Sequence, residues 1–313
     1  MNAKDWFIRA QNEGYAIGAF NVDNLDIMRA ICVAGKNKKS PVMVEFSPGE
    51  VSYFGLKNIV DLVANAKEEY GIPILLNLDH AKKVEDCMAA IEKLSPDNSS
   101  TPGVKASHAP GVALVGTPVI FDDIHFDGSE LPYEENVAST KRVVEAAHAK
   151  GLLVEGEIDR LSGSSEVHLE QLDLETIKKG YTDPTRAAKF VAETGVDIFA
   201  AVFGNVHGTF PNQPDLDFKL LGEIRKALPN TFLSMHGGSG IPAEQVKEAI
   251  RAGGIVKVNV NTEIRQAFHD ALAEKMSENP DEYAYYKMTP DMVMAVAAVV
   301  EAKIEVFGSV GKA

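Results

Sequence analysis

Short apolar segments alternate with longer amphipathic segments along the whole chain, and this alternation limits the fold more than any other feature of the 313 residues. Between the apolar segments, hydrophobic residues recur at spacings of three and four, as in Val137, Val143, Val144 and Ala147, which indicates helices. Eight strands followed by helices predict a parallel (β/α)8 barrel, that is, a TIM barrel forming a single domain. The eight expected strands are Ala16–Phe20, Val42–Phe46, Ile72–Leu78, Val119–Phe126, Leu152–Gly156, Ile198–Val202, Phe232–Met235 and Val256–Val260.

An open, doubly wound sheet is the alternative arrangement for the same alternation. Such a sheet would need a nucleotide-type glycine turn after the first strand. The residues at that place are Phe20-Asn21-Val22-Asp23-Asn24, which contain no glycine. The barrel is therefore the expected fold.

Two long connections interrupt the alternation. Residues 95–118 are rich in Pro, Ser, Gly and Asn and are too long for an ordinary barrel connection, so we expect an inserted loop between the third helix and the fourth strand. Residues 158–181 form the second long connection and carry Gly163, Ser164 and several carboxylates. Long connections at the C-terminal ends of barrel strands are typical lids, which predicts a mobile active-site loop here.

Composition narrows the range of partners and compartments. A net charge of −14 argues against nucleic acid or an anionic membrane as a partner. No stretch reaches the roughly 20 apolar residues of a membrane span, and the first residues lack the apolar run of a signal peptide. The two cysteines, Cys32 and Cys87, fall inside apolar helical patterns, which favours buried free thiols over a disulfide. We therefore expect a cytoplasmic protein.

Three histidines, His80, His207 and His236, lie at the C-terminal ends of three of the expected strands. Active sites of this fold collect at that end of the barrel, so the three side chains can converge on one point. Three neutral nitrogen ligands with an open fourth position describe a catalytic zinc site. The other histidines, His125 among them, do not show a comparable setting.

Carboxylates accompany these histidines. Asp79 directly precedes His80, and beside a metal it acts either as a proton donor and acceptor or as a carboxylate that orients a ligand histidine. Glu155 and Glu157 fall on the same face of the fifth strand because strand side chains alternate. Glu157, nearer the mouth of the barrel, is a candidate for an additional metal ligand, and Asp127 at the end of the fourth strand is a similar candidate.

Two late segments suggest a phosphate site. Gly237-Gly238-Ser239-Gly240 follows the seventh strand, and Asn259-Val260-Asn261-Thr262 follows the eighth and opens a helix, with Asn261 or Thr262 as its N-cap. Loops at these two positions are the usual phosphate cradle of the barrel. Lys257, inside the eighth strand, either forms a Schiff base with a substrate or has a structural role.

Together these motifs resemble the class II, metal-dependent ketose-bisphosphate aldolases, the fructose- and tagatose-bisphosphate aldolase family. The order and spacing hold over nearly the whole chain. The matching segments are Gly18–Val22, Leu78–His80, Phe126–Ser129, Glu134–Asn136, Val154–Glu157, Gly204–Gly208, His236–Gly240 and Lys257–Glu263.

The resemblance implies a role for each matching residue. His80, His207 and His236 would hold a catalytic Zn²⁺, and Asp79 would transfer the proton of the C4 hydroxyl. Asp127 and Glu157 would bind an accessory or alternative metal, and Glu166 would be the loop carboxylate that moves the C3 proton. Backbone carbonyls near Val206 and Gly237 would bind a monovalent cation, Na⁺ or K⁺. The residues implied in substrate binding are Asn21, Ser47, Gly208, Gly237, Gly238, Ser239, Asn259, Asn261 and Thr262.

Departures from the family pattern bear on the substrate. Asn77 stands where the family usually has a histidine, and Asp159 stands where it has a glycine at the start of the lid. The stretch Tyr283–Lys287 contains no arginine, although the family often supplies one there for the far phosphate from a neighbouring subunit. Lys287 would replace it only as a point charge. The second phosphate and the sugar epimer therefore stay open.

The sequence thus predicts a zinc-dependent aldolase that reversibly cleaves fructose 1,6-bisphosphate into dihydroxyacetone phosphate and glyceraldehyde 3-phosphate. Tagatose bisphosphate or another ketose 1-phosphate is the alternative substrate. A second hypothesis uses an imine on Lys257, and a third is a non-catalytic barrel that binds metal and sugar phosphate. The resemblance also implies a homodimer or homotetramer.

Overall fold

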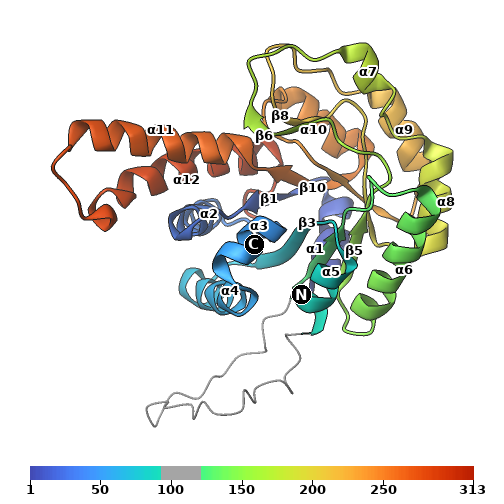
Figure 1. The fold of residues 1–313 in the computed structure, drawn as a ribbon, viewed down its shortest axis with the longest axis horizontal. Helices are drawn as coiled ribbons and strands as arrows, with labels where there is room; N and C mark the ends of the chain where they lie inside the picture. Colours follow the sequence, from blue (N-terminus) through green and yellow to red (C-terminus); the bar gives the residue numbers. More distant parts are fainter. Residues whose placement is uncertain (93–120) are drawn as a thin grey trace, which may run out of the picture.

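A closed barrel of eight parallel strands forms the centre of the computed structural model, which describes residues 1–92 and 121–313 (Figure 1). The TIM barrel is confirmed and the open sheet is excluded, because β1 pairs with both β2 and β10 and closes the ring. The predicted loop at 95–118 and the start of the fourth expected strand lie outside the described residues. The barrel strands are β1 (Ile17–Asn21), β2 (Val42–Phe46), β3 (Ile74–Ala81), β4 (Asp123–Phe126), β5 (Leu153–Gly156), β7 (Ile198–Ala200), β9 (Phe232–Met235) and β10 (Ile255–Val260).

Helices surround the barrel and bury its outward-facing side chains, such as Val44, Leu76 and Val258, in the main hydrophobic core. Several helices begin at an Asn or Asp whose side chain accepts a hydrogen bond from the first turn, as Asn24 does for α2, a contact worth about 1 kcal/mol. The surrounding helices are α2 (Leu25–Lys38), α3 (Pro48–Phe54), α4 (Leu56–Tyr70), α5 (Val84–Glu92), α6 (Tyr133–His148), α8 (Pro184–Thr194), α9 (Phe218–Ala227), α10 (Ala243–Gly253), α11 (Thr262–Glu278) and α12 (Thr289–Val306).

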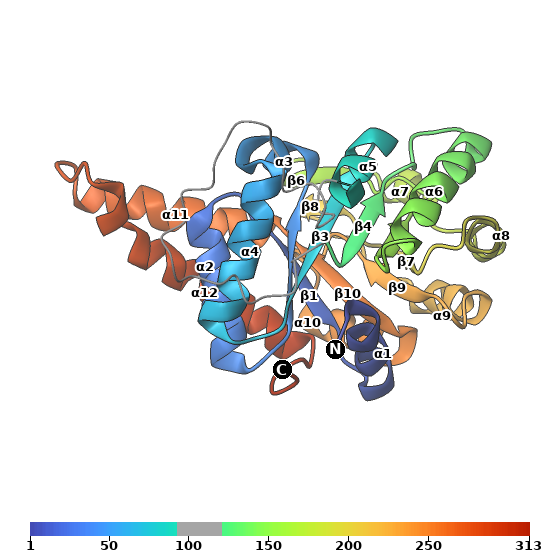
Figure 2. The same ribbon diagram turned by 90° about the horizontal axis from the view of Figure 1, so that it is seen from below.

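The first helix closes the N-terminal end of the barrel. It is α1 (Ala3–Glu13), which begins with a reciprocal capping box between Asn2 and Asp5. Its apolar face, with Trp6 and Phe7, packs against inward-facing strand residues in a second hydrophobic cluster. Figure 2 shows α1 at one end of the barrel and α3, β6 and β8 at the other. The functional groups must therefore lie at the C-terminal end, above this apolar layer.

A small second sheet covers part of that C-terminal end. It consists of β6 (Gly163–Val167) and β8 (His207–Thr209), which pair in parallel. The first of these strands belongs to the connection predicted as a mobile loop, residues 158–181, which also contains α7 (Leu174–Lys178). The pairing fixes His207, whose backbone N–H donates to the carbonyl of Ser162 at 2.8 Å.

Helices α11 and α12, with the 3-10 turn Tyr285–Lys287 between them, project from the barrel as a pair (Figure 1). We call residues 262–306 the arm. Among the described helices, none combines the length and the apolar composition that crossing a membrane requires. Cys32 and Cys87 are buried free thiols, as the sequence predicts.

Candidate active site and metal centre

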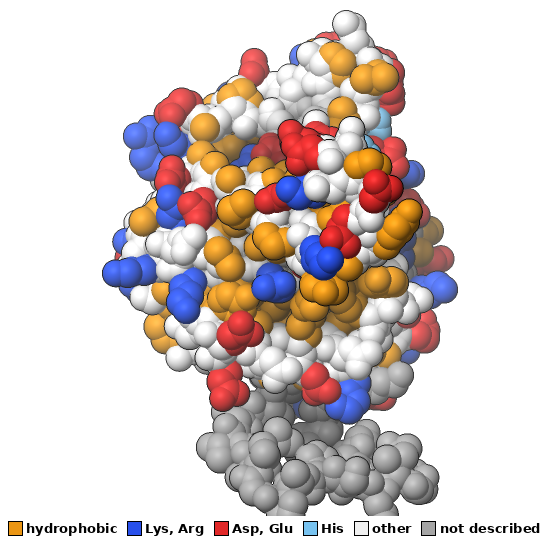
Figure 3. Space-filling view, turned by 90° about the vertical axis from the view of Figure 1, so that its left-hand side faces the viewer, with side chains coloured by type: hydrophobic (Ala, Val, Ile, Leu, Met, Phe, Trp, Pro, Cys, Tyr) orange, Lys and Arg blue, Asp and Glu red, His pale blue; other side chains and the backbone are white. Residues whose placement is uncertain are grey.

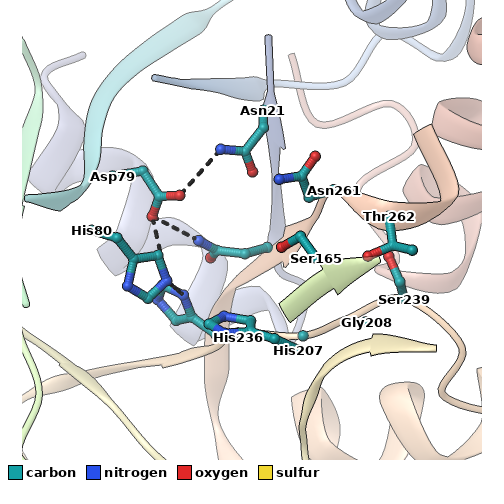
Figure 4. A pocket seen from close by; sticks show the side chains of 12 residues that line it. Asn21, Asp79, His80, Ser165, His207, Gly208, His236, Ser239, Asn261 and Thr262 are labelled. Atoms are coloured by element: carbon teal, nitrogen blue, oxygen red, sulfur yellow. Dashed lines mark hydrogen bonds and ion pairs between the residues drawn. The ribbon is translucent and has the colours of Figure 1, made fainter. Parts of the chain in front are cut away.

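The three predicted histidines converge at the C-terminal end of the barrel (Figure 4). Nε2 of His80 lies 2.9 Å from Nδ1 of His236. The ring centroids are 4.7 Å apart for this pair, 5.1 Å for His80 and His207, and 6.2 Å for His207 and His236. Three imidazoles on one tetrahedral zinc, with Zn–N bonds of about 2.0–2.1 Å, would have centroids roughly 5 Å apart. The two pairs that include His80 are close to this spacing, and the pair of His207 and His236 is wider.

A bulge in β3 lets two adjacent residues, Asp79 and His80, both face this point. Leu78 pairs with Ile124 and Ala81 pairs with Phe126, so two residues of β3 stand opposite one residue of β4. His80 has a φ of +48°, a left-handed conformation that costs a residue with a side chain about 1–2 kcal/mol. In a regular strand one of the two side chains would point to the helices instead.

Two of the histidines are held by carboxylates on the ring nitrogen that faces away from the centre. Nδ1 of His80 lies 3.2 Å from Asp127, and Nε2 of His236 lies 2.8 Å from Glu155. Such contacts fix the tautomer and the orientation of a ligand histidine. The sequence places Glu155 only on one face of its strand, and its contact with His236 is a finding of the structure.

The three imidazoles differ in pKa, and therefore in whether a ring nitrogen is free to bind a metal ion. Burial lowers the pKa of His236 to about 4, against the opposing charge of Glu155. Burial, with His80 second, also lowers the pKa of His207 well below its usual value. For His80 burial acts the same way, but Asp79 and Asp127 outweigh it and raise the pKa to about 9. A metal ligand must be neutral, so an ion would displace a proton from His80 only.

Asp127 and Glu157 form a second group around the far side of His80. Their oxygens lie 3.2 and 3.8 Å from its Nδ1. Burial would raise the pKa of Asp127, but hydrogen bonds with Glu157 and His80 hold it well below its usual value. Burial, and then Asp127, raises the pKa of Glu157 well above its usual value. These three side chains also have the spacing of a metal-binding group.

Asp79 is buried and surrounded by polar groups. Asn21 donates to one carboxylate oxygen at 3.1 Å, and Asn259 donates to the other at 3.5 Å (Figure 4). Burial would raise the pKa of Asp79, but the neighbouring His80 outweighs it and holds the pKa well below its usual range. The carboxylate is therefore ionised.

His125 is a site residue that sequence reasoning missed. Its side chain is fully buried beside the three histidines, with its ring centroid 4.5 Å from that of His80. The spacing of Asp79, His80, His125 and His236 is that of a potential metal-binding group. A signal was present in the sequence: because strand side chains alternate, His125 shares its face with Asp123, two residues earlier in β4.

Below the histidines, the barrel interior holds a buried ionic cluster. Nζ of Lys257 contacts Glu45 at 3.1 Å, Asp123 at 3.3 Å and Glu155 at 2.5 Å, and all four side chains are fully buried. Burial would lower the pKa of Lys257, but the three carboxylates outweigh it and raise the pKa well above its usual value. An imine-forming lysine needs a neutral amine that reaches the substrate, so this geometry argues against the Schiff-base hypothesis and favours a structural role.

Replacing Lys257 by methionine is expected to destabilise the fold by about 3–5 kcal/mol, because it leaves buried carboxylates without their cation. Urea unfolding should show a lower midpoint with an unchanged slope. Lys57→Met, at a side chain 85% exposed in a surface ion pair with Asp61, is the matched control and should leave the midpoint within error. Equal midpoints for both variants would contradict the ionic cluster as a stabilising unit.

The histidines open into a pocket with a cavity volume of about 60 Å³. Most predicted substrate residues lie in its wall. Asn261 occupies the N-cap position of α11, as predicted, but its side chain makes no capping hydrogen bond. The lining residues are Asn21, Asp79, His80, Ser165, His207, Gly208, His236, Gly237, Ser239, Asn259, Asn261 and Thr262.

Three residues predicted to bind substrate or to transfer a proton do not line the pocket. The N–H of Gly238 already donates to the carbonyl of Asn259 at 2.8 Å. Ser47 precedes α3, and its N–H donates to Glu50. Glu166 is exposed on β6, whereas the adjacent Ser165 lines the pocket. The predicted proton transfer by Glu166 stays a prediction.

Tight packing requires glycine at the turn after β9. Gly237 has a φ of +66°, and a Cβ there would lie 2.0 Å from the carbonyl oxygen of Val206. The segment that carries His236 therefore lies directly against the segment that carries His207, and this close approach leaves room only for glycine.

Comparison with known proteins agrees with this site. A family model described as fructose-bisphosphate aldolase class-II matches residues 1–312. A fructose-bisphosphate aldolase of Streptococcus pneumoniae serotype 4 is 38% identical over 326 residues, covering 100% of this chain and 99% of that protein. A fructose-bisphosphate aldolase of Streptococcus pyogenes serotype M3 is 37% identical over 327 residues, covering 100% of this chain and 99% of that protein.

Solved structures give the same result. The YdjI aldolase of Escherichia coli K12 aligns with a TM-score of 0.76 at 28% identity, covering 100% of this chain and 99% of that chain. A putative fructose-1,6-bisphosphate aldolase of Coccidioides immitis aligns with a TM-score of 0.79 at 27% identity, covering 99% of this chain and 97% of that chain. The converging histidines, the whole-chain family match and the curated relatives together show that this chain belongs to the class II fructose-bisphosphate aldolase family.

Proposed function

We propose that this protein reversibly cleaves fructose 1,6-bisphosphate into dihydroxyacetone phosphate and glyceraldehyde 3-phosphate, with Zn²⁺ held by His80, His207 and His236. The observation that carries the proposal is the convergence of these rings beside a buried, ionised Asp79. A divalent ion bound there supplies Lewis-acid chemistry at the ketone and stabilises the negative charge that cleavage leaves on the dihydroxyacetone phosphate fragment.

Asp79 is the proposed proton-transfer group. Its carboxylate accepts the proton of the C4 hydroxyl during cleavage and returns it during condensation. Hydrogen bonds from Asn21 and Asn259 hold the carboxylate in place next to the metal-binding nitrogens. Orientation by two amides lowers the cost of placing this group for reaction.

The pocket wall supports binding of a phosphorylated sugar. The side-chain oxygens of Asn259 and Asn261 are buried and find no hydrogen-bond partner among the described residues, so they are free to accept hydrogen bonds from sugar hydroxyls. Gly208, Gly237, Ser239 and Thr262 line the same wall, where α11 begins. A helix N-terminus carries partial positive charge and unsatisfied N–H groups, which suit a phosphate.

Several further features belong to the same proposal. Asp127 and Glu157 provide an alternative metal position on the far side of His80. We also propose a monovalent cation site at backbone carbonyls near Val206 and Gly237, which lie in adjacent segments.

The arm supports a homodimer or homotetramer. Hydrophobic side chains lie exposed among charged ones on the side of the molecule toward which the arm projects (Figure 3). Met276, Tyr283, Tyr286 and Met294 of the arm are each more than half exposed. Apolar surface of this kind is typical of protein–protein contacts.

The buried free thiols of Cys32 and Cys87 are compatible with the reducing cytoplasm that the sequence predicts.

A cleavage assay on a panel of ketose phosphates, with and without a chelator, tests the function. The panel contains fructose 1,6-bisphosphate, tagatose 1,6-bisphosphate and fructose 1-phosphate. Fructose 1,6-bisphosphate should give the highest kcat/KM, and the chelator should abolish cleavage of all three. A higher kcat/KM on tagatose bisphosphate or on the monophosphate would move the assignment to that substrate, which the lack of an arginine in Tyr283–Lys287 leaves open.

The same preparation tests the two other hypotheses. Borohydride added with substrate should not attach the sugar covalently, because Lys257 is enclosed by carboxylates. Covalent trapping together with chelator-resistant activity would replace the metal mechanism by the imine mechanism. A full metal content without cleavage of any sugar would identify a non-catalytic barrel.

A further inference from the structure

We propose that His125 is a positioning residue, which sets the bulge that carries both Asp79 and His80. It stands on β4 directly opposite this bulge, where one residue faces two. Its side chain is fully buried and is not among the residues that line the pocket. The inference deepens the proposed function, on which it rests, by adding a residue that acts through the metal ligand and the proton-transfer group.

The first step is a hydrogen bond between a side chain and the backbone of the bulge. In a regular parallel ladder, a strand N–H donates to a main-chain carbonyl of its neighbour. The bulge breaks this pattern at His80, and its backbone N–H donates instead to Nδ1 of His125 at 3.2 Å. The imidazole of His125 thus supplies an acceptor for a backbone group that the bulge has taken out of the ladder.

The second step is the contact of the same nitrogen with the carboxylate. Nδ1 of His125 lies 3.5 Å from Oδ1 of Asp79. One ring atom therefore touches the backbone of the metal-ligand residue and the side chain of the proton-transfer residue. A change at His125 should affect the placement of both.

The third step separates His125 from the metal ligands. His80 and His236 each have one ring nitrogen on a carboxylate and the other toward the common centre. In His125, Nδ1 accepts the backbone proton, so a neutral ring carries its own proton on Nε2 and has no lone pair there for an ion. Nε2 is buried and meets no hydrogen-bond partner in the described part of the chain.

Two substitutions test this assignment. In His125→Asn, the side-chain oxygen takes the position of Nδ1 and keeps the acceptor, whereas the rest of the ring is lost. In His125→Met, the acceptor is lost and most of the volume is kept. We expect kcat for fructose 1,6-bisphosphate to fall about 10- to 100-fold in His125→Met, the usual effect of removing a group that orients a metal ligand, with a small change in KM. The asparagine variant should stay within about threefold of the wild type.

Rescue by asparagine and the loss in kcat with little change in KM separate a positioning role from a merely structural one, and cobalt substitution separates it from that of a metal ligand. Loss of a ligand changes the intensity of the visible bands of bound Co²⁺. Because His125 is not a ligand in this proposal, His125→Asn should give the wild-type spectrum. A folded asparagine variant that loses as much activity as the methionine variant would overturn the proposal, and so would a changed cobalt spectrum, which would make His125 a ligand. Wild-type kcat in His125→Met would overturn it as well.

Two further points keep the test decisive. If His125→Met does not fold, the asparagine variant alone decides, because it retains only the proposed acceptor. If the wild-type protein cleaves none of the ketose phosphates, the proposed function fails, and titration with Co²⁺ tests His125 separately. The methionine variant should then bind Co²⁺ about 10- to 100-fold more weakly than the wild type, and the asparagine variant should bind like the wild type.

Discussion

Replacing His207 by alanine is expected to remove bound divalent metal and aldolase activity together. Two imidazoles would remain, and a catalytic zinc site normally has three protein ligands. His207 lies on β8, in the small second sheet outside the barrel ladder, so the barrel strands keep their pairing in the variant. Elemental analysis should fall from about one ion per chain in the wild type to near zero, and cleavage of fructose 1,6-bisphosphate should fall below detection.

A surface histidine provides the control for this experiment. His269 on α11 has a side chain 79% exposed, and its Nδ1 lies 2.9 Å from the carboxylate of Asp270. His269→Ala should keep both metal and activity. Zinc occupancy that survives undiminished in His207→Ala would show that the ligand set is wrong, even if activity were lost.

Replacing Asp79 by alanine should leave the metal in place and remove most of the turnover. The three imidazoles stay, so the metal content should match that of the wild type. A positioned acid–base group contributes about 10²–10⁴-fold to a rate, and kcat should fall by that factor. Asp61→Ala, at a carboxylate 57% exposed on α4, is the matched control and should leave kcat unchanged.

Metal content and kcat have to be measured on the same samples of Asp79→Ala. Parallel loss of both would assign Asp79 to holding the metal centre rather than to proton transfer. Read together, the His207 and Asp79 variants separate the residues that bind the ion from the residue that moves the proton.

The barrel could be predicted because its signals are local. Each barrel strand is a short apolar run that buries its outer face against helices, as in Val42–Phe46. Parallel strands place their C-terminal ends on one side, so His80 and His236 could be expected to meet without any knowledge of long-range contacts. Motif resemblance then added the roles of these residues.

The features that were missed depend on contacts between distant segments. Strand β6 reads Gly163-Ser164-Ser165-Glu166-Val167, which has no apolar pattern, and it exists because it pairs with β8. The importance of His125 depends on a bulge in the neighbouring strand, and no local sequence pattern announces that shift in pairing. Lys257 could be placed in a strand, but its enclosure by Glu45, Asp123 and Glu155 requires the closed ring.

The helix that fills the N-terminal end of the barrel has a consequence for how the protein is loaded. Because Trp6 and Phe7 fill that end with apolar side chains, we expect an ion and a sugar to enter from the C-terminal end, where the small sheet lies. His236 is almost fully buried in the wall of this pocket, so we expect an ion bound to it to enter before the sugar and to leave after it. A bound sugar phosphate would then cover the ion, and the ion and the sugar would bind and dissociate in a fixed order.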